Sequence, residues 1–282
     1  MTGLIVEGGA SRTYFAVGVM DALMENKINV DYITGASAGI SNALNYASGQ
    51  KGRGIDIGLK YLPKKEYCGI RHLVNPKNKS LYNIDYVFRK IPNELEPYDY
   101  DAFGKFEGSA EAAVTNVQTG KPEYLEITSQ DKSWRYLVAS CSLPMIFPIA
   151  EIDGKKYLDG GISDAVPFER AIQKNCDKLI VILTREKGYI KKKGGEEKYT
   201  SRFFGKYPLF AQTLANRSDM YNAQRKRLFA LEKEKRAFVF CPKDTALWKR
   251  TERDSTKIKK MYDEGYELGL QKIEELKQYL EK

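Results

Sequence analysis

Short apolar runs alternate with helical patterns through the first fifty residues of the chain. The run at 4–6 is typical of a buried strand, and a glycine-rich turn follows at 7–12. Residues 13–26 repeat apolar side chains at helical spacing, with one face formed by Phe15, Val19, Ala22 and Leu23. A second strand at 32–34 precedes a second helical stripe, made of Ile40, Ala43, Leu44 and Ala47. This strand-helix-strand-helix order predicts a parallel sheet covered by helices.

The rest of the chain is predicted to add strands around a less regular segment. Residues 51–110 mix many tyrosines with turn-forming residues, and we expect short helices and loops there that wall a pocket. Asp153-Gly154, between two alternating runs, is a strong hairpin signal. The apolar run at 179–183 is typical of a buried parallel strand. The strands predicted after residue 110 are 113–117, 123–127, 134–138, 151–152, 156–158, 179–183 and 237–240.

The last hundred residues combine a charged segment with helical patterns. Residues 187–198 are charged and contain glycine, so we expect a mobile loop whose lysines at 191–193 suit anionic headgroups. Aromatic and basic residues alternate at 202–210, which suits either a membrane interface or a helix that packs its rings against the core. One final helix is predicted from the apolar stripe Ile258, Met261, Tyr262, Ile273, Leu276 and Leu280.

Composition narrows the class of protein. With 42% hydrophobic residues and mixed charge, the 282-residue chain is expected to fold as a globular protein. Its 46 basic and 37 acidic side chains give a formal charge of +9. Such an excess suits nucleic acid, anionic lipid headgroups or acidic substrates. No DNA- or RNA-binding motif is present, so we expect no nucleic-acid partner.

The cysteines and the first residues of the chain indicate where in the cell the protein is expected. The cysteines form no Cys-x-x-Cys pair and are expected to be ordinary thiols without a zinc site: Cys68, Cys141, Cys176 and Cys241. The first strand begins so early that no signal peptide is expected, and no apolar run approaches the length of a membrane span. These features predict a cytoplasmic protein.

Ser37 lies between small residues where an apolar strand changes to a helix. Gly35-Ala36-Ser37-Ala38-Gly39 is the Gly-x-Ser-x-Gly arrangement of a nucleophile elbow. A side chain that projects from a sharp strand-to-helix turn needs neighbours of little bulk. Ser37 would lie at the helix N-terminus, where free N–H groups favour negative charge. A tight turn without chemistry needs the same small residues, so Ser37 becomes a candidate nucleophile only with a base nearby.

The base for Ser37 is predicted to be a carboxylate. His72 is the one histidine, in an irregular lysine- and asparagine-rich segment, whereas an α/β-hydrolase places its histidine after the acid, near the end. We therefore expect His72 to be a surface residue. Asp159 follows a predicted strand and precedes Gly160 and Gly161, which would let the loop pass close to Ser37. An ordinary Asp-Gly-Gly turn is the alternative interpretation.

Gly8, Gly9 and Ala10 directly follow the first strand and are predicted to form an oxyanion hole. Backbone N–H groups at a strand-to-helix junction point toward one spot, where they stabilise developing negative charge. Arg12 adds a positive charge beside it. A dinucleotide site is the rival interpretation, but Gly-x-Gly-x-x-Gly would need glycine where Ala10 and Thr13 stand.

In this chain order the three motifs resemble those of bacterial patatin-like phospholipases. The family's Gly-Gly-Gly-x-Arg-Gly motif corresponds to residues 8–13, its Gly-x-Ser-x-Gly motif to 35–39, and its Asp-Gly-Ala/Gly motif to 159–161. The resemblance extends over about residues 3–185, and further stretches that carry it are 140–144, 147–148 and 164–167.

The resemblance implies a fold and an activity. The expected fold is a three-layer α/β/α sandwich with a mostly parallel central sheet, divided into a catalytic domain at 1–185 and a mainly helical C-terminal extension at 186–282. The implied activity is hydrolysis of acyl lipid esters, of phospholipase A or lysophospholipase type, through a Ser37–Asp159 dyad without metal or cofactor. The implied site residues are Ser37 and Asp159 as the dyad, Gly8, Gly9, Ala10 and Arg12 at the oxyanion hole, and Gly35, Gly39, Gly160 and Gly161 in support.

The chain departs from the family motif at two glycines. Ala10 still supplies an N–H, and the hole survives if Ala10 needs no positive φ. Thr13 falls in the first helical turn, where a left-handed backbone is not expected. A lipid-binding or scaffold protein with weak catalysis is therefore the alternative to the hydrolase. The expected partners are a lipid or acyl-ester substrate and, transiently, an anionic membrane surface, with no oligomeric state implied.

Overall fold

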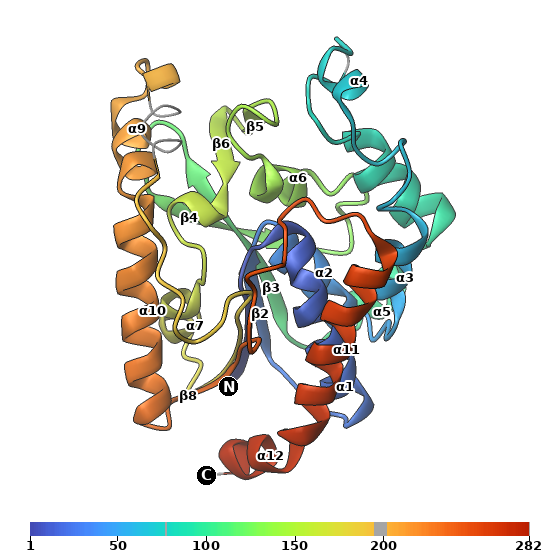
Figure 1. Ribbon diagram of the computed structural model, residues 1–282, viewed down its shortest axis with the longest axis vertical. Coiled ribbons are helices and arrows are strands. Elements are labelled where there is room, and N and C mark those ends of the chain that lie inside the picture. Colours follow the sequence, from blue (N-terminus) through green and yellow to red (C-terminus); the bar gives the residue numbers. More distant parts are fainter. Residues whose placement is uncertain (77, 195–201, 282) are drawn as a thin grey trace.

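A mixed sheet of eight strands runs through the described part of the chain, in the order β5-β6-β3-β2-β1-β7-β8 with β4 paired to β3. The computed structural model describes residues 1–76, 78–194 and 202–281 (Figure 1). The strands are β1 (Thr2–Val6), β2 (Tyr32–Ala36), β3 (Ser109–Asn116), β4 (Pro122–Ile127), β5 (Ala150–Ile152), β6 (Lys155–Asp159), β7 (Lys178–Ile182) and β8 (Ala237–Phe240).

The centre of the sheet is parallel and one end is antiparallel. β1 pairs in parallel with β2 and β7, β2 with β3, and β7 with β8. β4 and β6 pair antiparallel with β3, and β5 with β6. The β5–β6 hairpin turns at Asp153 and Gly154, both with positive φ, as the Asp-Gly signal predicts. The predicted mostly parallel α/β fold is confirmed.

Helices cover both faces of the sheet. Figure 1 shows α7 and α10 on one side and α1, α2 and α11 on the other. The helical segments are η1 (Ala10–Thr13), α1 (Tyr14–Glu25), α2 (Ala38–Ala47), α3 (Arg53–Lys60), α4 (Ile70–Leu73), the π-helix η2 (Tyr86–Leu95), α5 (Tyr100–Gly104), α6 (Arg135–Cys141), η3 (Gly160–Ile162), α7 (Phe168–Gln173), α9 (Pro208–Ala215), α10 (Arg217–Lys233), α11 (Ser255–Gln271) and α12 (Ile273–Glu281).

Alternate residues of the strands β1, β2, β7 and β8 build two separate cores. Leu4 of β1 packs with Phe15 of α1 in the core on one face. Its neighbour Ile5 packs with Phe168 of α7 and Leu228 of α10 on the other. Successive strand side chains point to opposite faces, so a strand buried on both sides reads as a continuous apolar run. This arrangement gives the predicted three layers.

The structure differs from the predicted elements in two places. Residues 134–138 are not a strand: Trp134 is left-handed, with φ of 55°, and α6 begins at Arg135. Short apolar runs do not separate strand from helix by periodicity, and here the helix packs against β3 and β6. The predicted final helix is two helices, α11 and α12, that separate at Lys272.

Residues after 185 take part in the central sheet and in both covering layers. They supply β8 at the sheet edge, α10 on one face and α11 on the other. Of the predicted loop at 187–198, residues 187–194 contain no helix or strand, and 195–198 lie outside the described residues. No helix in the described ranges is long and apolar enough to cross a membrane.

Candidate active site

Ser37 occupies the sharp turn between β2 and α2, with φ of 55° and ψ of −134°. A positive φ is uncommon for a residue with a side chain and persists only where the surroundings hold it. The Ser37 N–H donates to Ser140 Oγ at 2.9 Å, and Ser140 Oγ donates to Ala113 O at 2.7 Å. A Cβ added to Gly39 would lie 2.4 Å from Val6 O, so the small residues let the elbow approach β1 closely.

β3 brings the ends of β2 and β6 together. β2 pairs with β3 so that Ala36 is opposite Ala113, and β6 runs antiparallel with Asp159 opposite Val114. β4 occupies one edge of β3, alongside both the part that pairs with β2 and the start of the part that pairs with β6. β2 and β6 therefore lie one after the other along the opposite edge of β3. Their carboxyl ends therefore meet, and Ser37 and Asp159 approach one point of the sheet.

Asp159 is only 2% exposed, and its two carboxylate oxygens differ. Oδ1 accepts the Gly161 N–H at 2.8 Å, whereas Oδ2 has no hydrogen bond of ordinary geometry among the described residues. Burial raises the pKa of Asp159, against smaller lowering effects of Arg217 and the Ser37 hydroxyl. Ser37 and Asp159 line the same cavity, and no hydrogen bond of ordinary geometry joins them. Catalytic hydrogen bonds are often long or absent in ligand-free sites, and a raised pKa suits a general base.

The loop after β1 lies beside this pair. The Gly8 N–H donates to Ala165 O at 3.4 Å. The N–H groups of Gly9 and Ala10 donate to no carbonyl of the described residues, and both residues line the same cavity as Ser37. Two adjacent N–H groups are thus free to receive an oxygen that carries negative charge.

Ala10 does not meet the condition set by the sequence. It has a φ of 49°, so the condition that Ala10 needs no positive φ does not hold, although its N–H is still present. A left-handed backbone costs a residue with a Cβ about 1 kcal/mol or more, which explains glycine at this position of the motif. Thr13 has the expected helical conformation, with φ of −67°, and its hydroxyl donates to Ala10 O at 2.7 Å.

Two cavities share Ser37 and Ala10. The first has a volume of about 170 Å³ and is mainly apolar, lined among others by Leu44, Ile57, Leu62, Phe88, Ile91, Trp134, Leu137 and Phe147. The second, of about 110 Å³, is polar and lined among others by Glu7, Arg12, Asp159, Arg185, Arg217 and Arg250. The arrangement suits a molecule whose apolar chain and polar end are joined near Ser37.

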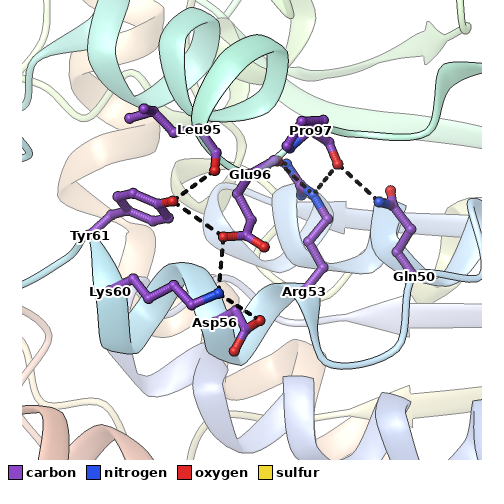
Figure 2. A network of polar contacts seen from close by, with 8 residues as sticks. All are labelled: Gln50, Arg53, Asp56, Lys60, Tyr61, Leu95, Glu96 and Pro97. Atoms are coloured by element: carbon purple, nitrogen blue, oxygen red, sulfur yellow. Dashed lines mark hydrogen bonds and ion pairs between the residues drawn. The ribbon is translucent and has the colours of Figure 1, made fainter.

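The segment 51–110 walls the apolar cavity, as predicted. α3 and the end of η2 are joined by a polar network (Figure 2). Arg53 Nη2 donates to Glu96 O at 2.7 Å, and the Tyr61 hydroxyl donates to Leu95 O at 2.8 Å. Lys60 pairs with the Glu96 carboxylate at 3.3 Å. These contacts hold the tyrosine-rich segment against α3, so apolar side chains of both elements face the cavity.

The predicted site residues separate into two groups. Seven line the polar cavity: Gly8, Gly9, Ala10, Arg12, Ser37, Asp159 and Gly161. Gly35, Gly39 and Gly160 do not line it and instead permit close backbone approach. A Cβ on Gly160, for example, would lie 2.0 Å from Ala113 O.

His72 is not the predicted surface residue. It is 7% exposed, and its Nε2 lies 3.0 Å from Lys65 O within the irregular segment. His72 lines neither of the two cavities at Ser37. The four cysteines are free, and no group of three His, Cys, Asp or Glu side chains in the described ranges is placed to hold a metal ion.

A family model described as patatin-like phospholipase matches residues 4–172. The chain belongs to the patatin-like phospholipase family. The match covers the loop after β1, the serine elbow and Asp159. A second model, a domain of unknown function (DUF6363), matches residues 207–281.

Several known proteins resemble this patatin-like chain. An uncharacterized Escherichia coli protein, YjjU, is 28% identical over 64% of this chain and 51% of its own length. Lysophospholipase NTE1 of Saccharomyces cerevisiae is 26% identical over 64% of this chain and 10% of its own length. The solved structure of VipD from Legionella pneumophila gives a TM-score of 0.45 at 14% identity, covering 95% of this chain and 66% of that one. The chain thus spans about half of YjjU and a small part of NTE1.

Sequence reasoning missed the cationic side of the site. Arg185, Arg217 and Arg250 border the cavity at Ser37 but lie far from the motifs along the chain. No spacing rule links them to Ser37, because they arrive there through β7, α10 and the segment before α11. Ser140 lies in the stretch 140–144 that resembles the family, so the sequence did mark it as a residue of interest. Its role as the hydrogen-bond acceptor of the Ser37 N–H is seen only in the folded structure.

Proposed function

We propose that this patatin-like protein is a serine acyl hydrolase that cleaves carboxylic esters of lipids. The observation that carries the proposal is Ser37 in a left-handed elbow that lines two cavities, one apolar and one polar, of which the polar one is also lined by the buried Asp159. The apolar cavity suits the acyl chain and the polar cavity the alcohol part of the ester. Membership in the family and similarity to proteins named lysophospholipases support the same substrate class.

The proposed reaction uses Asp159 as the base. Ser37 Oγ attacks the ester carbonyl while its proton passes to Asp159, and the N–H groups of Gly9 and Ala10 stabilise the oxyanion, with Arg12 adding positive charge nearby. As the C–O bond to the alcohol breaks, Asp159 returns the proton to the leaving oxygen. A water molecule then gives a proton to Asp159 and attacks the acyl-enzyme. Fatty acid leaves as Ser37 regains its proton.

Substitution of the dyad tests this proposal. Ser37→Ala and Asp159→Asn are each expected to lower the turnover of a p-nitrophenyl ester by about a thousandfold or more, because the two residues act as a unit. Ser133→Ala, at an exposed serine, and Asp153→Asn, at the other end of β6, are matched controls that keep activity. Undiminished turnover in either dyad variant would refute the assignment.

A lipid-binding protein with weak catalysis is the second candidate. The left-handed Ala10 favours it, because the strained residue stands where the family motif has glycine. A fluorophosphonate probe separates the two candidates, since only an activated serine is labelled stoichiometrically. Labelling of the full chain and its loss in Ser37→Ala supports the hydrolase. No labelling of the folded full chain supports the binding protein.

Transient contact with an anionic membrane and a cytoplasmic location also remain proposals. Among the aromatic residues near α9, Phe204 and Phe210 are buried, so for these two rings the core-packing interpretation is confirmed. Phe203 is 67% exposed and Leu209 is 51% exposed, and these side chains are available to a lipid surface. Co-sedimentation with anionic vesicles at two salt concentrations tests the contact, and binding unaffected by salt would contradict its electrostatic part.

A further inference from the structure

The apolar cavity at Ser37 extends along helix α2. The residues on one face of α2 that line it lie at helical spacing: Ala38, Ser41, Asn42 and Asn45. Asn45 comes eight residues after Ser37, which corresponds to about 12 Å along a helix axis. An acyl chain attached at Ser37 would therefore follow α2 for about two helical turns.

The opposite wall of the cavity runs in the same direction. It includes Cys141 at the end of α6 and Trp134 just before α6 begins. Cys141 Sγ lies 3.4 Å from Ser41 Oγ, in the first turn of α2. The centre of the Trp134 ring lies 4.9 Å from that of Tyr98, whose hydroxyl donates to Leu44 O at 2.8 Å, in the last turns of α2. The cavity thus lies between α2 and α6, with the serine at one end.

Arg53 lies at the other end of the cavity. Its Nη1 donates to Asn45 Oδ1 at 2.8 Å, and its Cζ lies 5.3 Å from the centre of the Tyr98 ring. Its Nε and Nη2 donate to Glu96 O at 3.1 and 2.7 Å, and Nε also donates to Pro97 O at 3.3 Å (Figure 2). Since Tyr98 is only 6% exposed, the guanidinium, the ring and the amide together form an end wall.

A charged group at the end of an apolar cavity limits the chain that can occupy it. Burial lowers the pKa of Arg53, because its guanidinium is partly removed from water. A methylene group pressed against it would displace the hydrogen bonds to Asn45 and Glu96, and a buried donor without a partner costs free energy. Each methylene buried before that point gains free energy. Binding of an acyl chain should therefore strengthen with length up to Arg53 and not beyond it.

The dimensions of the cavity set the chain length. An apolar cavity of about 150 Å³ holds one benzene molecule, with six carbons. At about 170 Å³ the cavity at Ser37 has room for slightly more. Three bonds of an extended chain span about 3.8 Å, so a path of about 12 Å corresponds to about nine bonds. Volume and length therefore agree on a chain of about eight carbons.

We infer that the apolar cavity selects medium-length acyl chains, of about eight carbons, and that Arg53 sets this limit. The inference rests on the proposed hydrolase function and specifies its acyl side. With the carbonyl at Ser37, a chain of this length ends beside Asn45 and Arg53. A markedly longer chain has to displace the guanidinium or leave its end outside the cavity.

The test measures kcat/KM of the full chain for p-nitrophenyl butanoate, octanoate and dodecanoate in the same detergent micelles. For the wild type, kcat/KM is expected to rise by up to about fourfold per methylene as far as octanoate and to be lower for dodecanoate. In Arg53→Ala the ratio of dodecanoate to octanoate is expected to rise about tenfold, because the shorter side chain leaves room for about two more methylenes. Both esters are measured on one preparation, so the ratio does not depend on the folded fraction.

Two further variants separate the cavity from the network around it. Lys60→Ala is the matched control: it removes an exposed cation of the same network on α3 that does not line the cavity, and it should leave both ratios unchanged. Ile57→Phe, one helical turn after Arg53, fills part of the cavity. In this variant the ratio of octanoate to butanoate is expected to fall about fourfold, the value of one methylene.

Each outcome decides one part of the inference. Wild-type hydrolysis of dodecanoate as efficient as that of octanoate overturns the length limit. An unchanged ratio in Arg53→Ala overturns the role of Arg53. If Arg53→Ala yields no folded protein, the wild-type profile and Ile57→Phe decide, and an unshifted ratio in Ile57→Phe overturns the cavity as the acyl site.

Failure of the proposed function gives a different result. If the wild-type chain hydrolyses none of the esters and no fluorophosphonate labels it, the hydrolase proposal fails. Calorimetric binding of octanoate and dodecanoate to the folded full chain then tests the cavity by itself. Tighter binding of octanoate supports the length limit, and dodecanoate binding that is equal or tighter overturns it.

Discussion

At the scale of single residues, the site combines a strained backbone with a destabilised charge. Ser37 and Ala10 both have positive φ: the Ser37 N–H donates to Ser140 of α6, and the Ala10 carbonyl accepts from Thr13 of η1. Asp159 is buried, and its Oδ2 has no hydrogen-bond partner among the described residues. Sites that hold groups in costly states trade stability for reactivity. Changes that relieve the cost are therefore expected to stabilise the fold.

Asp159→Asn is expected to raise the Tm near neutral pH. The raised pKa means that the folded state binds this proton more tightly than the unfolded chain does. The group therefore favours folding below its ordinary pKa of about 4, and this contribution is lost as pH rises through the raised pKa. The neutral amide avoids that loss. Scanning calorimetry from pH 4 to pH 8 checks this.

The pH dependence supplies the control for Asp159→Asn. Its advantage over the wild type should shrink toward acid pH, where the wild-type carboxyl is protonated too. Asp153→Asn changes an exposed carboxylate on the same hairpin and should show no such trend. A Tm below that of the wild type at pH 7 would contradict a buried, destabilising charge at Asp159.

Ala10→Gly is expected to stabilise the protein by about 1 kcal/mol, because glycine adopts positive φ without the steric cost that alanine carries. The N–H is kept, so hydrolysis should persist. Urea unfolding measures the change. Ala230→Gly, at an exposed position inside α10, is the matched control and should destabilise by about 1 kcal/mol. Equal destabilisation by both changes would show that Ala10 carries no strain.

At the scale of elements, close backbone contacts organise the layers around the site. α1 and α11 cross where each presents a glycine to the other. A Cβ on Gly18 would lie 2.0 Å from Tyr262 O, and a Cβ on Gly265 would lie 2.0 Å from Phe15 O. The helices therefore pack backbone against backbone, and α11 is fixed on α1, the helix that follows the loop of Gly9 and Ala10.

Gly265→Ala is expected to cost about 1–3 kcal/mol, because overpacking at a tight contact forces the backbones apart. The free energy of unfolding in urea gives the value. Gly188→Ala is the matched control, since a Cβ there meets no atom within 4 Å. A neutral Gly265→Ala would mean that α11 moves away from α1 at little cost.

At the scale of the whole molecule, the C-terminal part supports the site directly. Ser11, next to Ala10, donates its N–H to Arg250 O at 3.1 Å and its hydroxyl to Glu252 O at 2.8 Å. Arg217 binds Gly161 O beside Asp159. The boundary between 1–185 and 186–282 stays a prediction, and we propose that the two parts fold together.

A chain of residues 1–185 alone is therefore expected to lose both stability and reactivity. Removing β8 exposes an edge of β7, and removing α11 exposes apolar side chains of α1. The shortened chain should bind ANS, unfold without a sharp transition and escape labelling by a fluorophosphonate. The full chain under the same conditions is the control. Cooperative unfolding of 1–185 with full labelling would show an independent catalytic domain.

The strands, the hairpin and the motifs were predictable because their signals are local. Small residues mark the turn at Ser37, Asp153-Gly154 fits only a few backbone conformations, and apolar runs mark strands buried on both faces. The helix at 135–141 and burial of His72 were not predictable, because tertiary packing decides between conformations that a short apolar or polar run permits equally.

Local signals along the chain therefore sufficed to predict the family resemblance, the mostly parallel sheet and the candidate groups of the site. Three features became visible only in the folded molecule: β2 and β6 meet along one edge of β3, Ala10 is left-handed, and distant arginines gather beside Ser37. Turn chemistry and periodicity act between near neighbours in the chain, whereas burial, like-charge repulsion and the pKa of Asp159 depend on groups that only the folded packing brings together.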